Sequence, residues 1–204
     1  MPYVRDHTWD INIWNDIVLN NEYAIHDPWP YNVIDIGGHI GSFSYKMLTQ
    51  HNTNKIIVIE PNIDNYNLLI KNLEPFITDN RVIALNKGIG PSGTKISISG
   101  TLGVNTGGSF YTPSNEGIDT LLLDDIINMI DNNLPILLKL DCEGCEYEAL
   151  ASCTQLERIN CIVGEFHIID NHHNVEIIQK ILKNYVFDYH FRSDHLGLFG
   201  AHKP

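Results

Sequence analysis

The segment over residues 33–42 constrains the fold more than any other part of the chain. It holds a short apolar run, the acid Asp35, and then Gly37, Gly38 and Gly41 before a segment with helical spacing. This order predicts a strand that ends in a tight turn, because glycine tolerates positive φ and lets the backbone approach a ligand. A strand, a glycine turn and a helix in succession are typical of α/β nucleotide-binding folds.

A second apolar segment, over residues 55–60, follows about twenty residues later and also ends on an acid, Glu60. In dinucleotide folds, an acid at the end of this strand accepts hydrogen bonds from a ribose. The two segments together predict a cofactor that contains a nucleoside.

The spacing of the glycines indicates which nucleoside to expect. Gly37-Gly38-His39-Ile40-Gly41 does not fit the G-x-G-x-x-G fingerprint of dinucleotide sites. Asp35 would repel a pyrophosphate, whereas an acid-rich pocket attracts the cationic S-adenosylmethionine. A glycine turn without a ligand is the structural alternative. The expected cofactor-binding residues are Asp35, Gly37, Gly38, His39, Gly41, Glu60 and Asp141.

Length and charge narrow the class of protein. The chain has 204 residues, of which 43% are hydrophobic, so we expect one domain over residues 1–204. Within it we expect an N-terminal segment with a short helix over residues 1–32 and a core over residues 33–204. The net charge of −12 argues against a nucleic-acid partner. Apolar runs are shorter than the roughly 18 residues of a membrane helix, and the start lacks a signal-peptide pattern, so we expect a cytoplasmic protein.

Apolar segments alternate along the chain and predict a doubly wound α/β sheet of seven strands, mostly parallel, with an antiparallel hairpin strand at the C-terminus. Residues 91–117 read as a loop with a short hairpin strand over residues 95–99. The expected strands cover residues 33–36, 55–60, 81–85, 136–141, 161–166, 185–191 and 196–202, and the expected helices cover residues 10–22, 62–74, 119–131, 146–153 and 174–184, with a further helix from Gly41.

Acidic residues lie at or near the carboxyl ends of four predicted strands: Asp35, Glu60, Asp141 and Glu165. Ligands of open α/β sheets bind outside these strand ends. One such acid is often only an exposed loop residue, but four of them predict a shared acidic edge at the ligand site.

The four cysteines are Cys142, Cys145, Cys153 and Cys161. The spacing Cys142-x-x-Cys145 is found in zinc and thiol-disulfide sites, which stay open as alternatives. Because small thiols next to apolar strands are usually buried, we expect reduced, buried cysteines and no structural disulfide in the cytoplasm.

Three motifs resemble the FkbM family of S-adenosylmethionine-dependent methyltransferases. They are Asp35-Ile36-Gly37-Gly38-His39-Ile40-Gly41, Ile59-Glu60-Pro61, and the segment Leu138 to Glu146, which matches K-x-D-x-E-G-x-E. The segment Val163 to His167 also resembles the family's fifth strand ending. The resemblance implies a Rossmann-like class I methyltransferase fold and O-methylation of a sugar, glycan or small natural product. The chain departs from the family at Gly38-His39, where alanine and asparagine are common.

Methyl transfer to a hydroxyl needs alignment and removal of a proton. Asp141 and His167 are the candidate catalytic residues, and histidine has a suitable pKa near neutral pH. Asp141, Glu165 and His167 have the chemistry of metal ligands, but without a fourth ligand we expect no metal. A catalytically inert S-adenosylmethionine-binding module and an NAD-linked oxidoreductase are the alternative functions.

Overall fold

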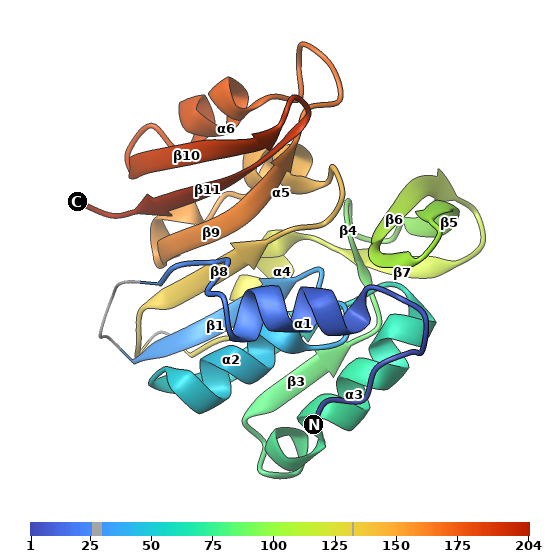
Figure 1. The fold of residues 1–204 in the computed structure, drawn as a ribbon. Helices are drawn as coiled ribbons and strands as arrows, with labels where there is room; N and C mark the ends of the chain where they lie inside the picture. The colour runs from blue at the N-terminus through green and yellow to red at the C-terminus, as the bar shows by residue number, and fades with distance from the viewer. Residues whose placement is uncertain (26–29, 132) are drawn as a thin grey trace.

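The computed structural model describes residues 1–25, 30–131 and 133–204, so part of the expected N-terminal segment, residues 26–29, lies outside the described residues. Its centre is a seven-stranded sheet in the order β10-β11-β9-β8-β1-β2-β3 (Figure 1). In this sheet β11 is antiparallel to both of its neighbours, and the other pairings are parallel. The strands are β1 (Tyr31–Ile36), β2 (Thr53–Ile59), β3 (Val82–Leu85), β8 (Ile136–Leu140), β9 (Ile159–His167), β10 (Val186–Ser193) and β11 (Leu196–His202).

Helices cover both faces of the sheet (Figure 1). One face packs against α1 (Asp10–Val18), α2 (Ser42–Gln50) and α3 (Ile63–Thr78), and the other packs against α4 (Leu123–Ile127), α5 (Glu146–Ser152) and α6 (Val175–Ile181). Side chains of β1 alternate between the two cores, because Val33 packs on the α1–α3 face and Ile34 on the opposite face. The doubly wound, mostly parallel sheet with an antiparallel C-terminal strand is therefore confirmed.

The region over residues 91–117 differs from the prediction. Instead of a loop with one short strand, it holds the hairpin of β5 (Lys95–Leu102) and β6 (Asn105–Ser114). This hairpin joins β7 (Ile118–Leu121) and β4 (Gly88–Ile89) in a second sheet of order β4-β7-β5-β6. The abundance of Gly, Ser and Asn misled the prediction, because cross-strand pairing sustains strands that the propensities of these residues do not favour.

The predicted helix over residues 119–131 is also wrong in its first part. Residues 118–121 form β7, where Ile118 pairs with Ile96 and Thr120 pairs with Gly88. Only Leu123–Ile127 is α-helical. Leucine and isoleucine suit either structure, so the pairing with β4 and β5 decided the outcome.

The helix predicted over residues 10–22 ends early, at Val18, and Asn21 takes a left-handed φ of 57°. Helix α3 begins where predicted, because the Asn62 side chain accepts a hydrogen bond from Asp64 N–H at 2.9 Å and so caps the helix. In the described parts of the chain, no helix has both the length and the apolar character needed to cross a bilayer.

Candidate active site

Lys139 lies at the centre of the site, near the carboxyl end of β8, with its side chain 3% exposed. Its Nζ donates hydrogen bonds to the carbonyl oxygens of Ile36 at 3.1 Å and Gly37 at 2.6 Å. The same nitrogen lies 3.5 Å from carboxylate oxygens of both Asp35 and Asp141. Lys139 thus joins the glycine turn after β1 to the end of β8.

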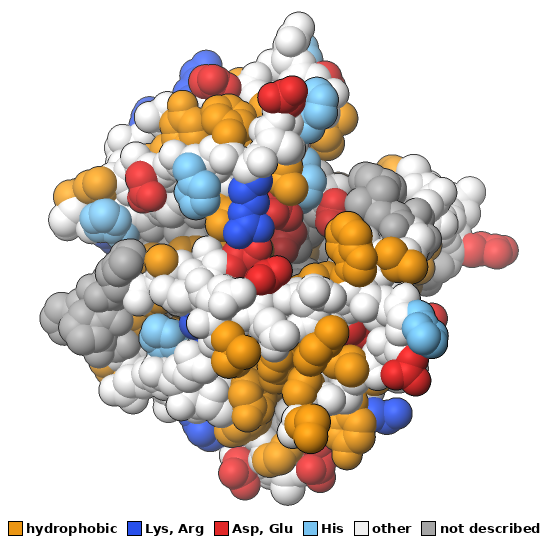
Figure 2. Space-filling view, in the orientation of Figure 1, with side chains coloured by type: hydrophobic (Ala, Val, Ile, Leu, Met, Phe, Trp, Pro, Cys, Tyr) orange, Lys and Arg blue, Asp and Glu red, His pale blue; other side chains and the backbone are white. Residues whose placement is uncertain are grey.

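The four acidic residues predicted at the strand ends do converge, because all four carboxyl groups act on the pKa of Lys139. Burial lowers the pKa of Lys139, but the nearby carboxylates outweigh burial and raise that pKa above its usual value. The carboxylates responsible are Asp141, Asp35, Glu60 and Glu165. Acidic side chains also gather in the central hollow of the surface that Figure 2 shows. Such a negative hollow favours a cationic ligand.

The glycines after β1 are required by close packing within the protein. Gly37 has a φ of 75°, and a Cβ there would lie 1.8 Å from the carbonyl oxygen of Asp141. A Cβ on Gly38 would lie 2.3 Å from Val58 Cγ2. Gly41, with a φ of 89°, precedes α2. The turn therefore packs directly against the end of β8 and against β2, and side chains at Gly37 and Gly38 would not fit there.

Glu60 lies directly after β2 and is buried. Among the described residues, its carboxylate accepts hydrogen bonds from His39 N–H at 2.8 Å, Asn62 N–H at 2.9 Å and Asn65 Nδ2 at 3.3 Å. Burial raises the pKa of Glu60 to about 7, against the opposing effect of these donors. A carboxylate has about four acceptor positions, so these hydrogen bonds leave one of them unused.

We expect binding of S-adenosylhomocysteine to strengthen as the pH rises from 6 to 8. The pKa of about 7 means that Glu60 loses its proton in this interval, and the charged form is the better hydrogen-bond acceptor. Calorimetric titrations at pH 6, 7 and 8 measure the effect. A Glu60→Gln variant should show a flatter dependence, and an equal pH dependence in both proteins would contradict the role of Glu60.

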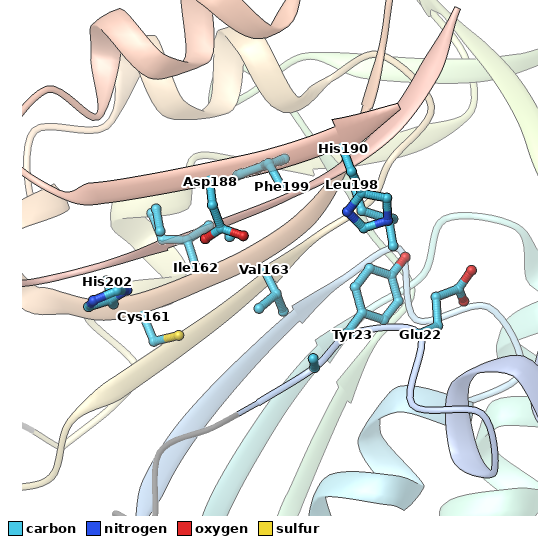
Figure 3. A pocket seen from close by; sticks show the side chains of 13 residues that line it. Glu22, Tyr23, Cys161, Ile162, Val163, Asp188, His190, Leu198, Phe199 and His202 are labelled. Atoms are coloured by element: carbon cyan, nitrogen blue, oxygen red, sulfur yellow. The ribbon is translucent and has the colours of Figure 1, made fainter. Parts of the chain in front are cut away.

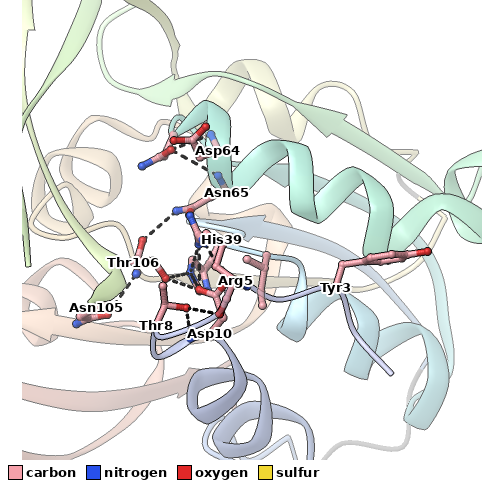
Figure 4. A network of polar contacts seen from close by, with 12 residues as sticks. Tyr3, Arg5, Thr8, Asp10, His39, Asp64, Asn65, Asn105 and Thr106 are labelled. Atoms are coloured by element: carbon pink, nitrogen blue, oxygen red, sulfur yellow. Dashed lines mark hydrogen bonds and ion pairs between the residues drawn. The ribbon is translucent and has the colours of Figure 1, made fainter. Parts of the chain in front are cut away.

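A polar network joins the N-terminal segment to the glycine turn and the hairpin (Figure 4). Arg5 binds the buried carboxylate of Asp10 through two nitrogens, each at 3.0 Å, and also donates to Asn65 Oδ1 at 2.7 Å. The ring of His39 lies 2.8 Å from Thr106 Oγ1 and 3.5 Å from Asp10. Burial lowers the pKa of His39, so the ring favours its neutral form. The expected cofactor contact of His39 stays a prediction, since its ring is engaged in this network.

A second cluster forms where β8 and β9 end side by side. The two nitrogens of His167 lie 3.2 Å from Glu143 Oε2 and 3.3 Å from Glu146 Oε1. Nε2 of the same ring lies 3.5 Å from Glu165 Oε2. Asp141 accepts a hydrogen bond from the Tyr23 hydroxyl at 2.8 Å. The structure thus brings the two predicted catalytic residues to the same end of the sheet.

The titration of His167 differs from the expectation. Burial lowers its pKa, but the close carboxylates of Glu143 and Glu146 outweigh burial and raise the pKa to about 11. The ring is then a cation at neutral pH and is not free to accept a proton. Burial also opposes ionisation of Asp141, yet Lys139 and His167 hold the pKa of Asp141 below its usual range. Asp141 is therefore ionised at neutral pH.

Residues that could ligate a metal ion also lie together in this cluster. One ligand atom each of Asp141, Glu165 and His167 lies within 4.8 Å of the others, so these residues could hold a divalent cation. A cation would compete with the proton on His167, because a metal binds the neutral ring. The sequence-based expectation of no metal stays a prediction.

The expectation of four reduced cysteines is wrong for one pair. Cys142 and Cys145 form a disulfide with a Cα–Cα distance of 5.5 Å. Their spacing of three residues and the tight loop between them bring the sulfurs together, which strand burial alone did not predict. Cys153 and Cys161 are partly buried and lie outside this disulfide.

A pocket of about 340 Å³ lies beside the cluster on the α1–α3 side of β9, β10 and β11 (Figure 3). Val163 and Leu198 form part of its apolar floor, and Asp188 and His190 add polar groups. Tyr23 lines the pocket and also binds Asp141, so it stands between the pocket and the cluster. The volume of the pocket is at the lower end of the range for small-molecule sites.

Sequence reasoning assigned no role of their own to four residues of the site: Lys139, Tyr23, Glu143 and Glu146. Lys139 could have been predicted to form an ion pair, because it lies inside the apolar strand over residues 136–140 and a lysine is almost never buried without a partner. The role of Tyr23 could not have been predicted, since its contact with Asp141 joins residues that are far apart in the sequence.

The strand order is that of a class I methyltransferase fold. The chain belongs to the FkbM methyltransferase family, because the methyltransferase FkbM domain matches residues 35–189. No curated protein matches the chain significantly.

Solved structures of methyltransferases share the fold. Methyltransferase FkbM from Methylobacillus flagellatus is 17% identical, with a TM-score of 0.63 over 92% of this chain and 47% of that one. The present chain thus spans about half the length of that relative. Precorrin-6y C5,15-methyltransferase from Geobacter metallireducens is 11% identical, with a TM-score of 0.56 over 100% and 94% of the two chains. TrmK of M. capricolum, solved with S-adenosylhomocysteine, is 13% identical, with a TM-score of 0.50 over 98% and 70%.

Proposed function

We propose that this protein is an S-adenosylmethionine-dependent O-methyltransferase whose acceptor is a hydroxyl of a sugar, glycan or small natural product. The observation that carries the proposal is the cluster of Asp141, Glu165 and His167 at the carboxyl ends of two adjacent strands. Ligands of doubly wound sheets bind at this edge, and membership of the FkbM family supports methyl transfer there.

The residues present fit the proposed cofactor. The buried carboxylate of Glu60 keeps an acceptor position for a ribose hydroxyl, and Asp35 Oδ1 is a buried oxygen without a hydrogen-bond partner among the described residues. The turn of Gly37 and Gly38 lies close to both acids, and Asp141 adds negative charge beside Gly37. We therefore propose that Asp35, Glu60, Asp141 and the glycine turn, with His39 and Gly41, hold S-adenosylmethionine.

When bound, S-adenosylmethionine supplies an electrophilic methyl group on a sulfonium. The protein must place the acceptor hydroxyl in line and receive its proton. We assign proton removal to Asp141, because it is ionised and its other contacts, Tyr23 and Lys139, fix its position. His167, predicted to be catalytic, becomes a positioning residue in this proposal: its ring contacts Glu143, Glu146 and Glu165 and keeps them next to Asp141.

We place the acceptor in the pocket at the end next to Tyr23, the residue whose hydroxyl binds Asp141. A volume of about 340 Å³ suits a small molecule or one sugar unit of a glycan. Asp188, His190 and Glu22 offer hydrogen-bonding groups for several hydroxyls, while Val163 and Leu198 offer an apolar surface for a ring. The net charge of −12 supports a partner other than nucleic acid. Action in the cytoplasm is part of the proposal.

Transfer of a labelled methyl group from S-adenosylmethionine to a panel of sugars, glycans and phenolic natural products tests this function. We expect labelled product that depends on Asp141. Tight cofactor binding without transfer to any acceptor would favour the inert binding module. Binding of NADH with quenching of its fluorescence would favour the oxidoreductase.

A further inference from the structure

We propose that Cys142 and Cys145 are a thiol-disulfide exchange site that controls the segment Asp141 to Glu146, here called the acidic loop. The disulfide directly follows the proposed proton acceptor, Asp141; it encloses Glu143 and directly precedes Glu146, and these two acids contact His167. The effect on methyl transfer rests on the proposed function, whereas the exchange reaction and the change in the loop do not.

The disulfide encloses a strained backbone. Glu143 has a φ of 57° and Gly144 a φ of 107°, so both residues between the cysteines are left-handed. A glutamate rarely takes this conformation, and residues held there persist only where the surrounding structure enforces it. The bond between Cys142 and Cys145 closes the chain around them and is a direct means of enforcement.

The enforced conformation places two carboxylates on one imidazole. Glu143 lies inside the disulfide ring, and its Oε2 is 3.2 Å from His167 Nε2. Glu146 follows the ring immediately; its Oε1 is 3.3 Å from His167 Nδ1 and accepts a hydrogen bond from Cys142 N–H at 3.0 Å. Opening the ring therefore frees Glu143 to leave the left-handed region and removes its contact with His167.

Both cysteines are only partly buried, so a dithiol can reach them. In the exchange, a thiolate of the dithiol attacks one sulfur of the pair and forms a mixed disulfide. The second thiolate of the dithiol then displaces the protein sulfur. The cysteine pair gains two electrons and two protons, and the dithiol is oxidised to a disulfide. A low-molecular-weight disulfide, such as oxidised glutathione, reverses the reaction.

The test compares the full chain before and after dithiothreitol treatment. Alkylation with iodoacetamide followed by peptide mapping should modify Cys142 and Cys145 only after reduction. Amide hydrogen exchange in the acidic loop should accelerate on reduction. Binding of S-adenosylhomocysteine should weaken by about tenfold, within the range typical of coupled sites, and should recover after oxidation with oxidised glutathione.

Two variants serve as controls. Cys142→Ser/Cys145→Ser should behave like the reduced protein and ignore dithiothreitol. Cys153→Ser, which changes a cysteine outside the loop, should respond like the wild type. Alkylation of Cys142 and Cys145 without prior reduction would overturn the proposal. So would proven reduction that changes neither amide hydrogen exchange in the acidic loop nor the affinity for S-adenosylhomocysteine. If S-adenosylhomocysteine binds in neither state, the proposed function is contradicted, and hydrogen exchange alone decides whether the disulfide controls the loop.

Discussion

Replacing Lys139 with methionine is expected to lower the free energy of unfolding by about 3–5 kcal/mol, the usual cost of removing one partner of a buried ion pair. The substitution keeps the apolar length of the side chain but leaves the carboxylates of Asp35 and Asp141 without their shared cation. It also removes the donor that binds the carbonyl oxygens of Ile36 and Gly37. Urea unfolding at pH 7 measures the change.

A matched control is Lys87→Met, which also removes one positive charge. Lys87 pairs with Asp119 at 2.7 Å, but both side chains are substantially exposed. Exposed pairs contribute at most about 1 kcal/mol, so this variant should unfold nearly like the wild type. Equal destabilisation by the two substitutions would show that burial of Lys139 among carboxylates is not important for stability.

Replacing Asp141 with asparagine is expected to lower kcat by about 10²–10⁴-fold, the range for loss of a general base. The amide keeps the shape of the side chain and can still accept the hydrogen bond from Tyr23, but it cannot take the acceptor's proton. Because Asp141 is also a proposed cofactor contact, binding of S-adenosylhomocysteine should weaken as well. Steady-state kinetics with an identified acceptor, together with calorimetry, separate the two effects.

Two further variants sharpen this result. Glu148→Gln removes a carboxylate from an exposed position on α5, and its turnover should stay near that of the wild type. His167→Ala should lower turnover less than Asp141→Asn, because the ring is already protonated at neutral pH. A larger loss in His167→Ala, with activity that rises as the ring loses its proton, would return the role of base to His167.

Much of the fold could be predicted because its strongest signals are local. Residues 33–36, 56–59 and 136–140 of the predicted strands are buried on both faces of the sheet, so each strand reads as a nearly continuous apolar run. The acids at the strand ends converge, because the carboxyl ends of parallel strands meet at one edge. The charge around Lys139 reflects that convergence.

The remaining features depend on contacts between distant residues. Strand β7 takes its conformation from pairing with β4 and β5, which the sequence of residues 118–121 does not encode alone. The raised pKa of His167 depends on Glu143 and Glu146, which lie more than twenty positions earlier in the chain. The disulfide requires the left-handed turn at Glu143 and Gly144, and nothing in the spacing of the cysteines distinguished it from a reduced pair.

Calorimetric titration of the full chain with S-adenosylhomocysteine tests the central claim most directly, because it needs no knowledge of the acceptor. We predict binding at one site per chain. In Glu60→Ala the binding should weaken by about 1.5–3 kcal/mol, the contribution of hydrogen bonds to a charged group. A titration without binding heat for S-adenosylhomocysteine, from a protein that binds NADH under the same conditions, would contradict the assignment as a methyltransferase.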